Sequence, residues 1–294
     1  MDPYDIRNLG GKLMNFEKLM IIGTGLIGTS LALAFKETNS IRKISGYDVN
    51  RTNSQDALKL GSIDEIENLQ DGIPTADIII FATPVESIKD ILTNTIELIK
   101  PGTIVSDVGS TKYQIVKIFD SFVDKNINFI GGHPMAGTEN SGPLFARKDL
   151  FKNKPYVLVK TKKCSNEAFE KFRCLINKIE ANPVIMEAQK HDKIVAVTSH
   201  LPQIVSFYLA KTLLKEKDED FLKLVGSGFK DTTRLAKSDP TIWIDIFKQN
   251  KENILNSVEI FESQIQNFKN NLNENKYKEI VEELKQVREF RNKL

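Results

Sequence analysis

Residues 19–28 read Leu-Met-Ile-Ile-Gly-Thr-Gly-Leu-Ile-Gly, and this stretch decides the fold that we predict. It begins with four apolar residues, as a short buried strand does, and continues with a glycine turn of the pattern GxGxxG. The segment from Thr29 to Lys36 is rich in Leu and Ala and predicts a helix. Strand, glycine turn and helix in this order are the context that a dinucleotide-binding motif requires.

The glycines of this turn have separate roles. Gly23 allows a tight turn, Gly25 lets a pyrophosphate approach the backbone, and Gly28 permits close packing of helix on strand. The helix N-terminus offers N–H groups and the positive end of its dipole to the phosphates. A second strand over 44–48 ends in Asp48, whose carboxylate can accept both ribose hydroxyls and would repel a 2′-phosphate. We therefore predict NAD as the cofactor; alone, the glycine motif would indicate only a tight turn.

Strand and helix patterns alternate through the first half of the chain. Further apolar runs predict strands over 77–83, 103–108, 128–130 and 156–159. Repeated βα units indicate an α/β fold of Rossmann type, with a doubly wound, mainly parallel sheet and helices on both faces. The loops after such strands emerge at one edge of the sheet, beside the nicotinamide. Ser110 and His133 lie in two of these loops, and we expect them to meet there.

The second half of the chain reads almost entirely as helix. After residue 160 the strand pattern nearly vanishes, apart from a brief run over 183–186. We predict a dinucleotide-binding domain over residues 1–163 and an all-helical domain over residues 164–294 that serves substrate binding and dimerisation. A self-contained helical bundle is the alternative to a dimer. Residues 1–13 are polar, and we expect them to be a leader or a loose tail.

Composition narrows the classes of partner. The 41 basic and 39 acidic residues nearly balance at a net charge of +2, which argues against nucleic acid as the main partner. No run approaches the roughly 20 apolar residues that cross a bilayer. Cys164 and Cys174 match neither a zinc pattern nor a disulfide framework, so we expect no metal and a reducing cytoplasm.

Several polar residues stand in otherwise small or apolar surroundings: Ser110, His133, Glu139, His200, Gln203, Asp231 and Arg234. His133 belongs to the stretch Gly-Gly-His-Pro-Met-Ala-Gly-Thr-Glu-Asn-Ser-Gly over 131–142, and an imidazole can accept a proton near neutral pH. Each residue also has an ordinary structural interpretation. His200 could be a satisfied core histidine, and Asp231 with Arg234 could be a surface ion pair.

Five segments together carry a family resemblance: GTGLIGTSLA, DVGSTK, GGHPMAGTENSG, SHLPQ and FKDTTRLA. In this order and with these gaps, they resemble the prephenate dehydrogenase family. That family comprises the prephenate, arogenate and mixed-specificity cyclohexadienyl dehydrogenases of tyrosine biosynthesis. The resemblance runs from about Leu19 to about Phe268. It implies an oxidative decarboxylation, in which prephenate and NAD⁺ give 4-hydroxyphenylpyruvate, CO₂ and NADH.

The resemblance assigns a role to each candidate. His133 matches the family's catalytic base toward the ring hydroxyl, Ser110 the serine that orients the imidazole, and Arg234 the arginine that binds a substrate carboxylate. His200 and Gln203 lie on the substrate side. The pocket gate consists of Glu139, Asp231 and Trp243. The cofactor-binding set consists of Gly23, Gly25, Leu26, Ile27, Gly28, Asp48, Thr83 and Pro84.

One departure from the family pattern bears on the substrate. Many members read H-L-P-H where this chain has Gln203 as the last residue of His-Leu-Pro-Gln. An uncharged amide cannot pair with the ammonium group of arogenate, so the departure favours prephenate. Arogenate or dual cyclohexadienyl specificity is the nearest alternative, and tyrosine is a candidate feedback ligand at the active site.

Two more remote functions remain open from the residues. A dehydrogenase of 3-hydroxy acids or imines would use a lysine, for which Lys190 or Lys193 could be nominated, although nothing ties either to the sheet edge. A non-catalytic NAD-binding protein would be favoured had His133 or Arg234 been replaced, and both are present.

Overall fold

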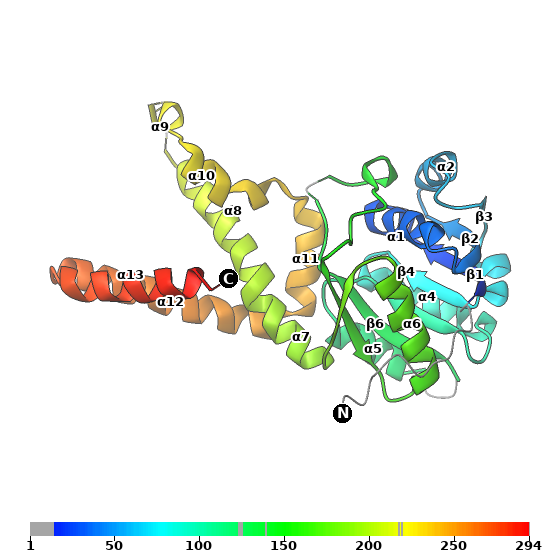
Figure 1. Cartoon of the computed structure of the whole chain (residues 1–294). Helices are drawn as coiled ribbons and strands as arrows, with labels where there is room; N and C mark the ends of the chain where they lie inside the picture. Colours follow the sequence, from blue (N-terminus) through cyan, green and yellow to red (C-terminus); the bar gives the residue numbers. More distant parts are fainter. Residues whose placement is uncertain (1–14, 123–125, 139, 217, 219, 294) are drawn as a thin grey trace. The chain divides into compact units, whose positions relative to one another are not determined.

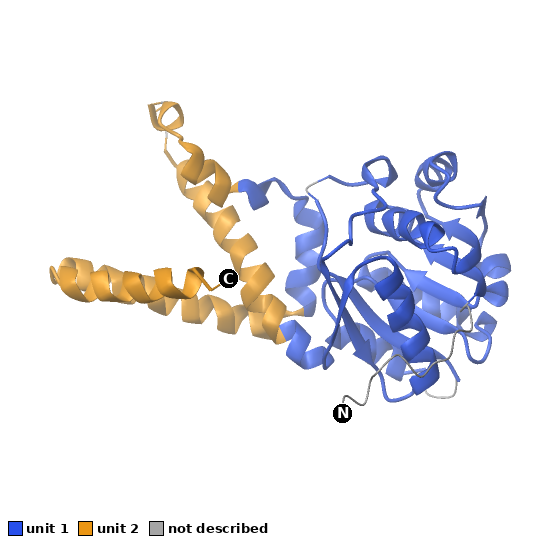
Figure 2. Cartoon of the chain, viewed as in Figure 1, with its two compact units in different colours: residues 1–192, 234–249 blue, residues 193–233, 250–294 orange. Residues whose placement is uncertain are grey.

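The structure is a computed structural model that describes residues 15–122, 126–138, 140–216, 218 and 220–293 (Figure 1). The predicted leader over residues 1–13 and the gate residue Glu139 lie outside the described residues. The chain divides into two compact units (Figure 2). The first comprises residues 1–192 and 234–249, and the second comprises residues 193–233 and 250–294.

Within the described residues, eight strands form one sheet in the order β3-β2-β1-β4-β5-β6-β7-β8. The strands are β1 (Phe16–Ile22), β2 (Ile41–Tyr47), β3 (Glu65–Ile66), β4 (Ile78–Phe81), β5 (Ile104–Asp107), β6 (Asn128–Pro134), β7 (Pro155–Lys160) and β8 (Asn182–Ile185). Neighbouring strands pair in parallel, except that β6 and β7 are antiparallel. The order of the first six is that of a doubly wound dinucleotide-binding sheet, which confirms the predicted fold class.

The helices of the first unit lie between these strands or follow the last of them. They are α1 (Leu26–Glu37), α2 (Arg51–Lys59), α3 (Leu69–Gly72), α4 (Val85–Thr95), α5 (Tyr113–Asp120), α6 (Asn166–Lys178), α7 (Ala188–Val195), which continues into the second unit from Lys193, and, from later in the chain, α11 (Pro240–Gln249). Asn50 caps α2 and Ser165 caps α6, because each side chain accepts a hydrogen bond from a backbone N–H of the first turn.

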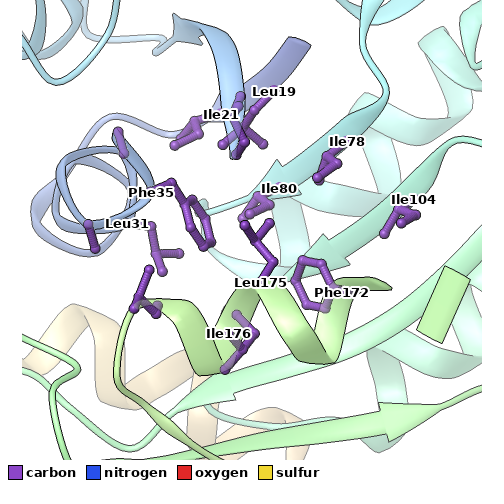
Figure 3. Close-up of a cluster of buried hydrophobic side chains, with 14 of the residues drawn as sticks. Leu19, Ile21, Leu31, Phe35, Ile78, Ile80, Ile104, Phe172, Leu175 and Ile176 are labelled. Atoms are coloured by element: carbon purple, nitrogen blue, oxygen red, sulfur yellow. The ribbon is translucent and has the colours of Figure 1, made fainter. Parts of the chain in front are cut away.

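The central strand β1 packs on both of its faces. Leu19 and Ile21 belong to a buried cluster with side chains of α1 and α6 (Figure 3). Met20 and Ile22 point the other way, into a cluster with side chains of α4 and α5. All four side chains are fully buried, and each contributes about 1.5–3 kcal/mol of transfer free energy. The glycine turn that follows β1 is therefore held by a strand anchored from two sides.

The first unit extends beyond residue 163, where the sequence analysis places a domain boundary. Phe172 and Leu175 of α6 are fully buried in the same cluster as β1 (Figure 3). Strand β8 corresponds to the brief strand pattern over 183–186 and pairs in parallel with β7. Because α6 and β8 pack within this sheet and its core, the spatial division falls near residue 192.

The described elements of the second unit are all helical, which confirms the predicted helical C-terminal half. They are a π-helical turn (Ala196–His200), α8 (Leu201–Leu213), α9 (Asp220–Lys223), α10 (Ser227–Thr232), α12 (Lys251–Asn273) and α13 (Tyr277–Arg291). The π turn lies directly before Pro202, whose missing N–H and ring disturb the regular helical ladder. In the described part of the chain, none of the helices is both long and apolar enough to span a bilayer.

Candidate active site

The glycine turn after β1 is shaped for a dinucleotide. Gly23 has a φ of 102°, and a Cβ there would lie 2.4 Å from the carbonyl oxygen of Ala82. A Cβ on Gly28 would lie 2.0 Å from the carbonyl oxygen of Gly23. At Gly25, by contrast, a Cβ would meet nothing within 4 Å. The first and third glycines are thus required by close backbone packing, and the second leaves open space beside the backbone.

That open space lies at the N-terminus of α1. Gly25 is the N-cap residue, and no side chain caps this helix end. The first N–H groups of α1, at Leu26 and Ile27, have no partner within their own helix and can donate to a pyrophosphate. The chain therefore provides the N–H donors and the room that the phosphates of NAD need.

Asp48 stands directly after β2, beside the same turn. Its Oδ2 atom accepts a hydrogen bond from the N–H of Thr24 at 2.8 Å, and its Oδ1 atom accepts one from the N–H of Asn50 at 2.8 Å. These bonds fix the carboxylate next to the glycine turn, where an adenosine ribose lies in folds of this type.

Thr83 and Pro84 follow β4, the strand next to β1. The Oγ1 atom of Thr83 is buried and has no hydrogen-bond partner among the described residues. Its Cγ2 atom would be 3.0 Å from a Cβ on Gly23, which places Thr83 against the glycine turn. A buried hydroxyl in this position can hydrogen-bond to a bound cofactor. Pro84 is the N-cap residue of α4.

His133 lies on a strand and not in a loop. The predicted end of this strand at Ile130 is wrong, because residues 130–134 pair antiparallel with β7 and His133 pairs with Val157. The imidazole is 8% exposed. Since β6 runs parallel to β5, His133 lies toward the carboxyl edge of the sheet, as predicted.

The partner of the His133 imidazole is a second histidine. The Nδ1 atom of His133 lies 2.8 Å from the Nε2 atom of His191, and the Nδ1 atom of His191 lies 2.8 Å from Oδ1 of Asp192. We did not predict a role for His191 or Asp192 from the sequence. The sequence does mark the two residues as candidates, because the chain contains only three histidines and His191 directly precedes a carboxylate.

Ser110 lies, half-buried, in the turn between β5 and α5. Asp107 ties this turn to β6, since its carboxylate accepts hydrogen bonds from the N–H of Gly109 at 2.8 Å and from the N–H of Gly132 at 3.1 Å. A Cβ on Gly132 would lie 2.3 Å from the carbonyl oxygen of Asp107. The two segments carrying Ser110 and His133 are therefore neighbours, while the orienting role of Ser110 stays a prediction.

A buried ion pair lies beneath this edge. The Nζ atom of Lys112 contacts Oδ2 of Asp107, and both side chains are fully buried. Burial lowers the pKa of the Lys112 ammonium, and the contact with Asp107 opposes that change. Burial also raises the pKa of the nearby Tyr156 phenol, and the charge of Asp107 raises it further. Tyr156 is therefore neutral at physiological pH, and its hydroxyl has no hydrogen-bond partner among the described residues.

Two predicted substrate residues lie in the second unit. His200 is 1% exposed, and its Nδ1 atom lies 3.2 Å from Nδ2 of Asn250. Gln203 is 3% exposed and lies in the first turn of α8. The contact with Asn250 involves only the Nδ1 atom of His200, and the substrate roles of His200 and Gln203 stay predictions.

The remaining predicted residues are distributed over different elements. Asp231 lies on α10 in the second unit, whereas Arg234 begins a separate 3₁₀ turn (Arg234–Lys237) in the first unit, and both side chains are exposed. The two residues are therefore not on one continuous helix. Trp243 lies on α11, and its Nε1 atom donates a hydrogen bond to Oγ of Ser238 at 3.0 Å. The predicted gate and the substrate role of Arg234 stay predictions.

A metal centre was not expected from the sequence. In the part of the chain that the structure describes, no group of three or more His, Cys, Asp and Glu side chains could hold a metal ion.

A doubly wound sheet, an open glycine turn and a buried histidine near the same sheet edge define an NAD-dependent oxidoreductase of the dehydrogenase class. Two domain models of one family match the chain: the nucleotide-binding domain of prephenate dehydrogenase over residues 31–185, and its dimerization domain over residues 187–286. The chain belongs to the prephenate dehydrogenase family.

Individual relatives agree with this assignment. A prephenate dehydrogenase of Lactococcus lactis subsp. cremoris is 37% identical over 88% of this chain and 70% of its own length. The structure of prephenate dehydrogenase from A. aeolicus, in complex with hydroxyphenyl propionate and NAD⁺, has a TM-score of 0.89 at 32% identity and covers 95% of this chain and 99% of that one. The arogenate dehydrogenase of Synechocystis has a TM-score of 0.81 at 30% identity, over 94% of this chain and 99% of that one.

Proposed function

We propose that this chain catalyses the NAD-dependent oxidative decarboxylation of prephenate to 4-hydroxyphenylpyruvate, as a step of tyrosine biosynthesis, with His133 as the base. The observation that carries the proposal is the buried imidazole of His133 near the carboxyl edge of the sheet, where such folds hold the nicotinamide. The activity named for the Lactococcus and A. aeolicus relatives supports the choice of substrate.

In this reaction, the side chains of the protein must carry out one proton transfer. NAD⁺, when bound, accepts the hydride from the ring carbon that bears the hydroxyl. His133 takes the hydroxyl proton as the hydride departs, which avoids a cationic product. The bond to the ring carboxylate then breaks, CO₂ leaves, and the released electron pair completes the aromatic ring. The phenolic oxygen takes back the proton from His133, so the base is regenerated and no net proton is consumed.

The substrate carries two carboxylates, and the chain offers groups that suit them. Arg234 can bind one carboxylate with two parallel N–H donors, and its side chain is exposed for such a contact. Gln203 is an uncharged amide and offers no negative charge to pair with an ammonium group, which favours prephenate over arogenate. Arogenate is the second candidate, and the likeness to the Synechocystis arogenate dehydrogenase supports it.

The test is an assay of NADH formation with prephenate and with arogenate side by side, each repeated with added tyrosine. We expect a higher kcat/KM with prephenate. A higher kcat/KM with arogenate would reverse the substrate assignment, and no NADH from either compound would reject the activity. Inhibition that prephenate relieves competitively would make tyrosine a ligand of the active site.

The base is tested by the His133→Asn variant. Because the amide cannot take up the proton, we expect kcat to fall by about 10²–10⁴-fold while prephenate still binds. Binding is measured directly by calorimetry in the presence of NADH. A variant with near-normal kcat would reject His133 as the base.

A further inference from the structure

A row of buried side chains stands behind the proposed base. His133, His191 and Asp192 follow one another through two contacts of 2.8 Å. The two imidazole rings meet edge to face, with their centroids 5.0 Å apart and an interplanar angle of 76°. His191 is 1% exposed and Asp192 is 2% exposed. The chemistry described above uses only the first member of this row.

Backbone donors fix the far end of the row. The Oδ1 atom of Asp192 accepts a hydrogen bond from the N–H of Lys112 at 2.7 Å, and Oδ2 accepts one from the N–H of Tyr113 at 2.9 Å. These donors lie at the start of α5, where the helix dipole also favours a negative charge. Asp192 is therefore held as a carboxylate, which can only accept hydrogen bonds.

The carboxylate determines where the protons of both imidazoles lie. His191 must donate its Nδ1–H to Asp192, so the Nε2 atom of neutral His191 carries a lone pair. His133 must then donate its own Nδ1–H to that lone pair. The remaining nitrogen of neutral His133, Nε2, is left without a proton. That form is the one in which an imidazole can act as a base.

Asp192 is the carboxylate of this row, and its charge also acts on the buried Lys112 ammonium. Lys112 and Asp107 form a fully buried pair with each other, so their charges offset one another. Tyr156, on the neighbouring strand β7, is a neutral phenol whose pKa burial raises. When His133 takes up a proton, the positive charge is stabilised by the carboxylate of Asp192 through His191.

We propose that His191 and Asp192 are positioning residues of this enzyme: they hold His133 in the Nδ1–H tautomer, so that its unprotonated Nε2 can take the substrate proton. The proposal rests on the proposed role of His133 as the base. It extends that role to two residues that do not themselves touch the substrate proton, in the arrangement by which a carboxylate orients a catalytic imidazole.

The first test replaces the carboxylate by an amide. In Asp192→Asn, an amide NH₂ in the position of Oδ1 loses the hydrogen bond from the N–H of Lys112 and donates to Nδ1 of His191, which reverses both tautomers and puts a proton on Nε2 of His133. We expect kcat to fall by at least about 100-fold, with the KM for prephenate within about threefold of the wild-type value. Tyr156→Phe, a buried change near Asp107 and outside the row, is the matched control and should leave both constants unchanged.

Nitrogen NMR of the labelled imidazoles reads the tautomer without substrate. The chain has only three histidines, so single His→Gln variants assign every signal. We expect His133 to be protonated on Nδ1 in the wild type and on Nε2 in Asp192→Asn. An unchanged tautomer together with a kcat within about twofold of wild type would overturn the proposal. The NMR measurement needs no turnover, so its result does not depend on the outcome of the His133→Asn test of the base itself.

Asp192 also binds two backbone N–H groups, so Asp192→Asn could fail to fold. In that case a second pair of variants tests the proposed positioning role. His191→Gln keeps an acceptor oxygen within reach of His133, whereas His191→Phe removes the acceptor. We expect His191→Phe to lower kcat by about 100-fold and His191→Gln to retain at least about tenfold more kcat than His191→Phe. Equal kcat values in the two variants would overturn the proposal.

Discussion

At the scale of single residues, the proposed site combines a buried histidine, our candidate for the base, with an exposed arginine. His133 is fixed by strand pairing and by its contact with His191, and its side chain is almost fully buried. Arg234 is exposed at the start of a short 3₁₀ turn. A buried base loses little orientation between catalytic cycles, and an exposed guanidinium remains accessible to a charged substrate.

Arg234→Gln should therefore affect binding more than chemistry. A lost charge-assisted hydrogen bond costs about 1.5–3 kcal/mol, which corresponds to a rise in the KM for prephenate of about 10–150-fold. Steady-state kinetics measures the KM of this variant. Lys237→Gln, which removes another exposed cation of the same turn, is the control. A fall in kcat with an unchanged KM would show that the guanidinium does not anchor the substrate.

The two thiols should differ in reactivity. Burial raises the pKa of the Cys164 thiol to about 11, so at pH 8 this thiol holds about a hundredfold less thiolate than an ordinary cysteine. In a Cys174→Ser variant, we expect iodoacetamide to modify Cys164 slowly at pH 8. The rate should rise about tenfold for each pH unit until pH approaches 11. Mass spectrometry follows the modification, and a rate that does not change with pH would contradict this prediction.

The role of a single residue could be predicted only where a local sequence pattern identifies it. Gly23 and Gly28 could be recognised because close backbone packing leaves no room for a Cβ, and Gly25 because the motif keeps open space beside the backbone for a pyrophosphate. The contact of His133 with His191 spans 58 positions and depends on how α7 lies beside β6. No local spacing encodes such a contact, so the sequence marks His191 only as a rare histidine beside a carboxylate and does not show that it contacts His133.

At the scale of elements, the buried pair of Lys112 and Asp107 joins the β5–α5 turn to strand β6. Asp107 receives hydrogen bonds from Gly109 and Gly132, and its contact with Lys112 balances its charge in a fully buried position. Removing one ion of such a pair leaves the other uncompensated in a medium of low polarity.

Lys112→Met should therefore lower the free energy of unfolding by about 3–5 kcal/mol. The double variant Lys112→Met/Asp107→Asn should recover much of that loss, because the uncompensated charge at position 107 is gone and the amide oxygen still accepts one of the two backbone N–H groups. Urea denaturation of the wild type and both variants measures the difference. If the single and the double variant were equally unstable, the lysine would act through packing and not through its charge.

The sequence predicted well which segments form helices and strands, but not the residues at which these elements end. The apolar runs before residue 160 all became strands of the sheet, because buried parallel strands need continuous apolar faces. The end of β6 was misplaced because Gly131, Gly132 and Pro134 resemble a turn. Pairing with β7 extends the strand through them, and this partner is distant in sequence.

At the scale of the whole molecule, the second unit carries apolar side chains that its own helices do not cover. On α12 and α13, the exposed ones are Leu255, Ile260, Ile265, Phe268, Leu272, Tyr277, Val281, Leu284, Val287 and Phe290. Exposed apolar area of this extent is typical of an interface between subunits. The family model that matches residues 187–286 is described as a dimerization domain, which supports a homodimer as our proposal.

We expect the chain to have twice its monomer mass of 33.3 kDa in solution. The double variant Val281→Asp/Leu284→Asp places two charges in the apolar stripe of α13 and should yield the monomer mass. Gln286→Asp, on the opposite side of the same helix, is the control. Light scattering after size-exclusion chromatography measures the mass, and a monomeric wild type would reject the dimer.

Gly132 has a consequence for how sequences of this family can drift. Its missing side chain lets the backbone of β6 lie against the carbonyl of Asp107, so a change there damages folding before it damages turnover. If His133 is the base, as we propose, a copy of this chain released from selection for its reaction would come under weaker constraint at His133 and keep Gly132 for as long as it still folded. Invariance at position 132 therefore measures the persistence of the fold, and invariance at position 133 would measure the persistence of the proposed activity as well.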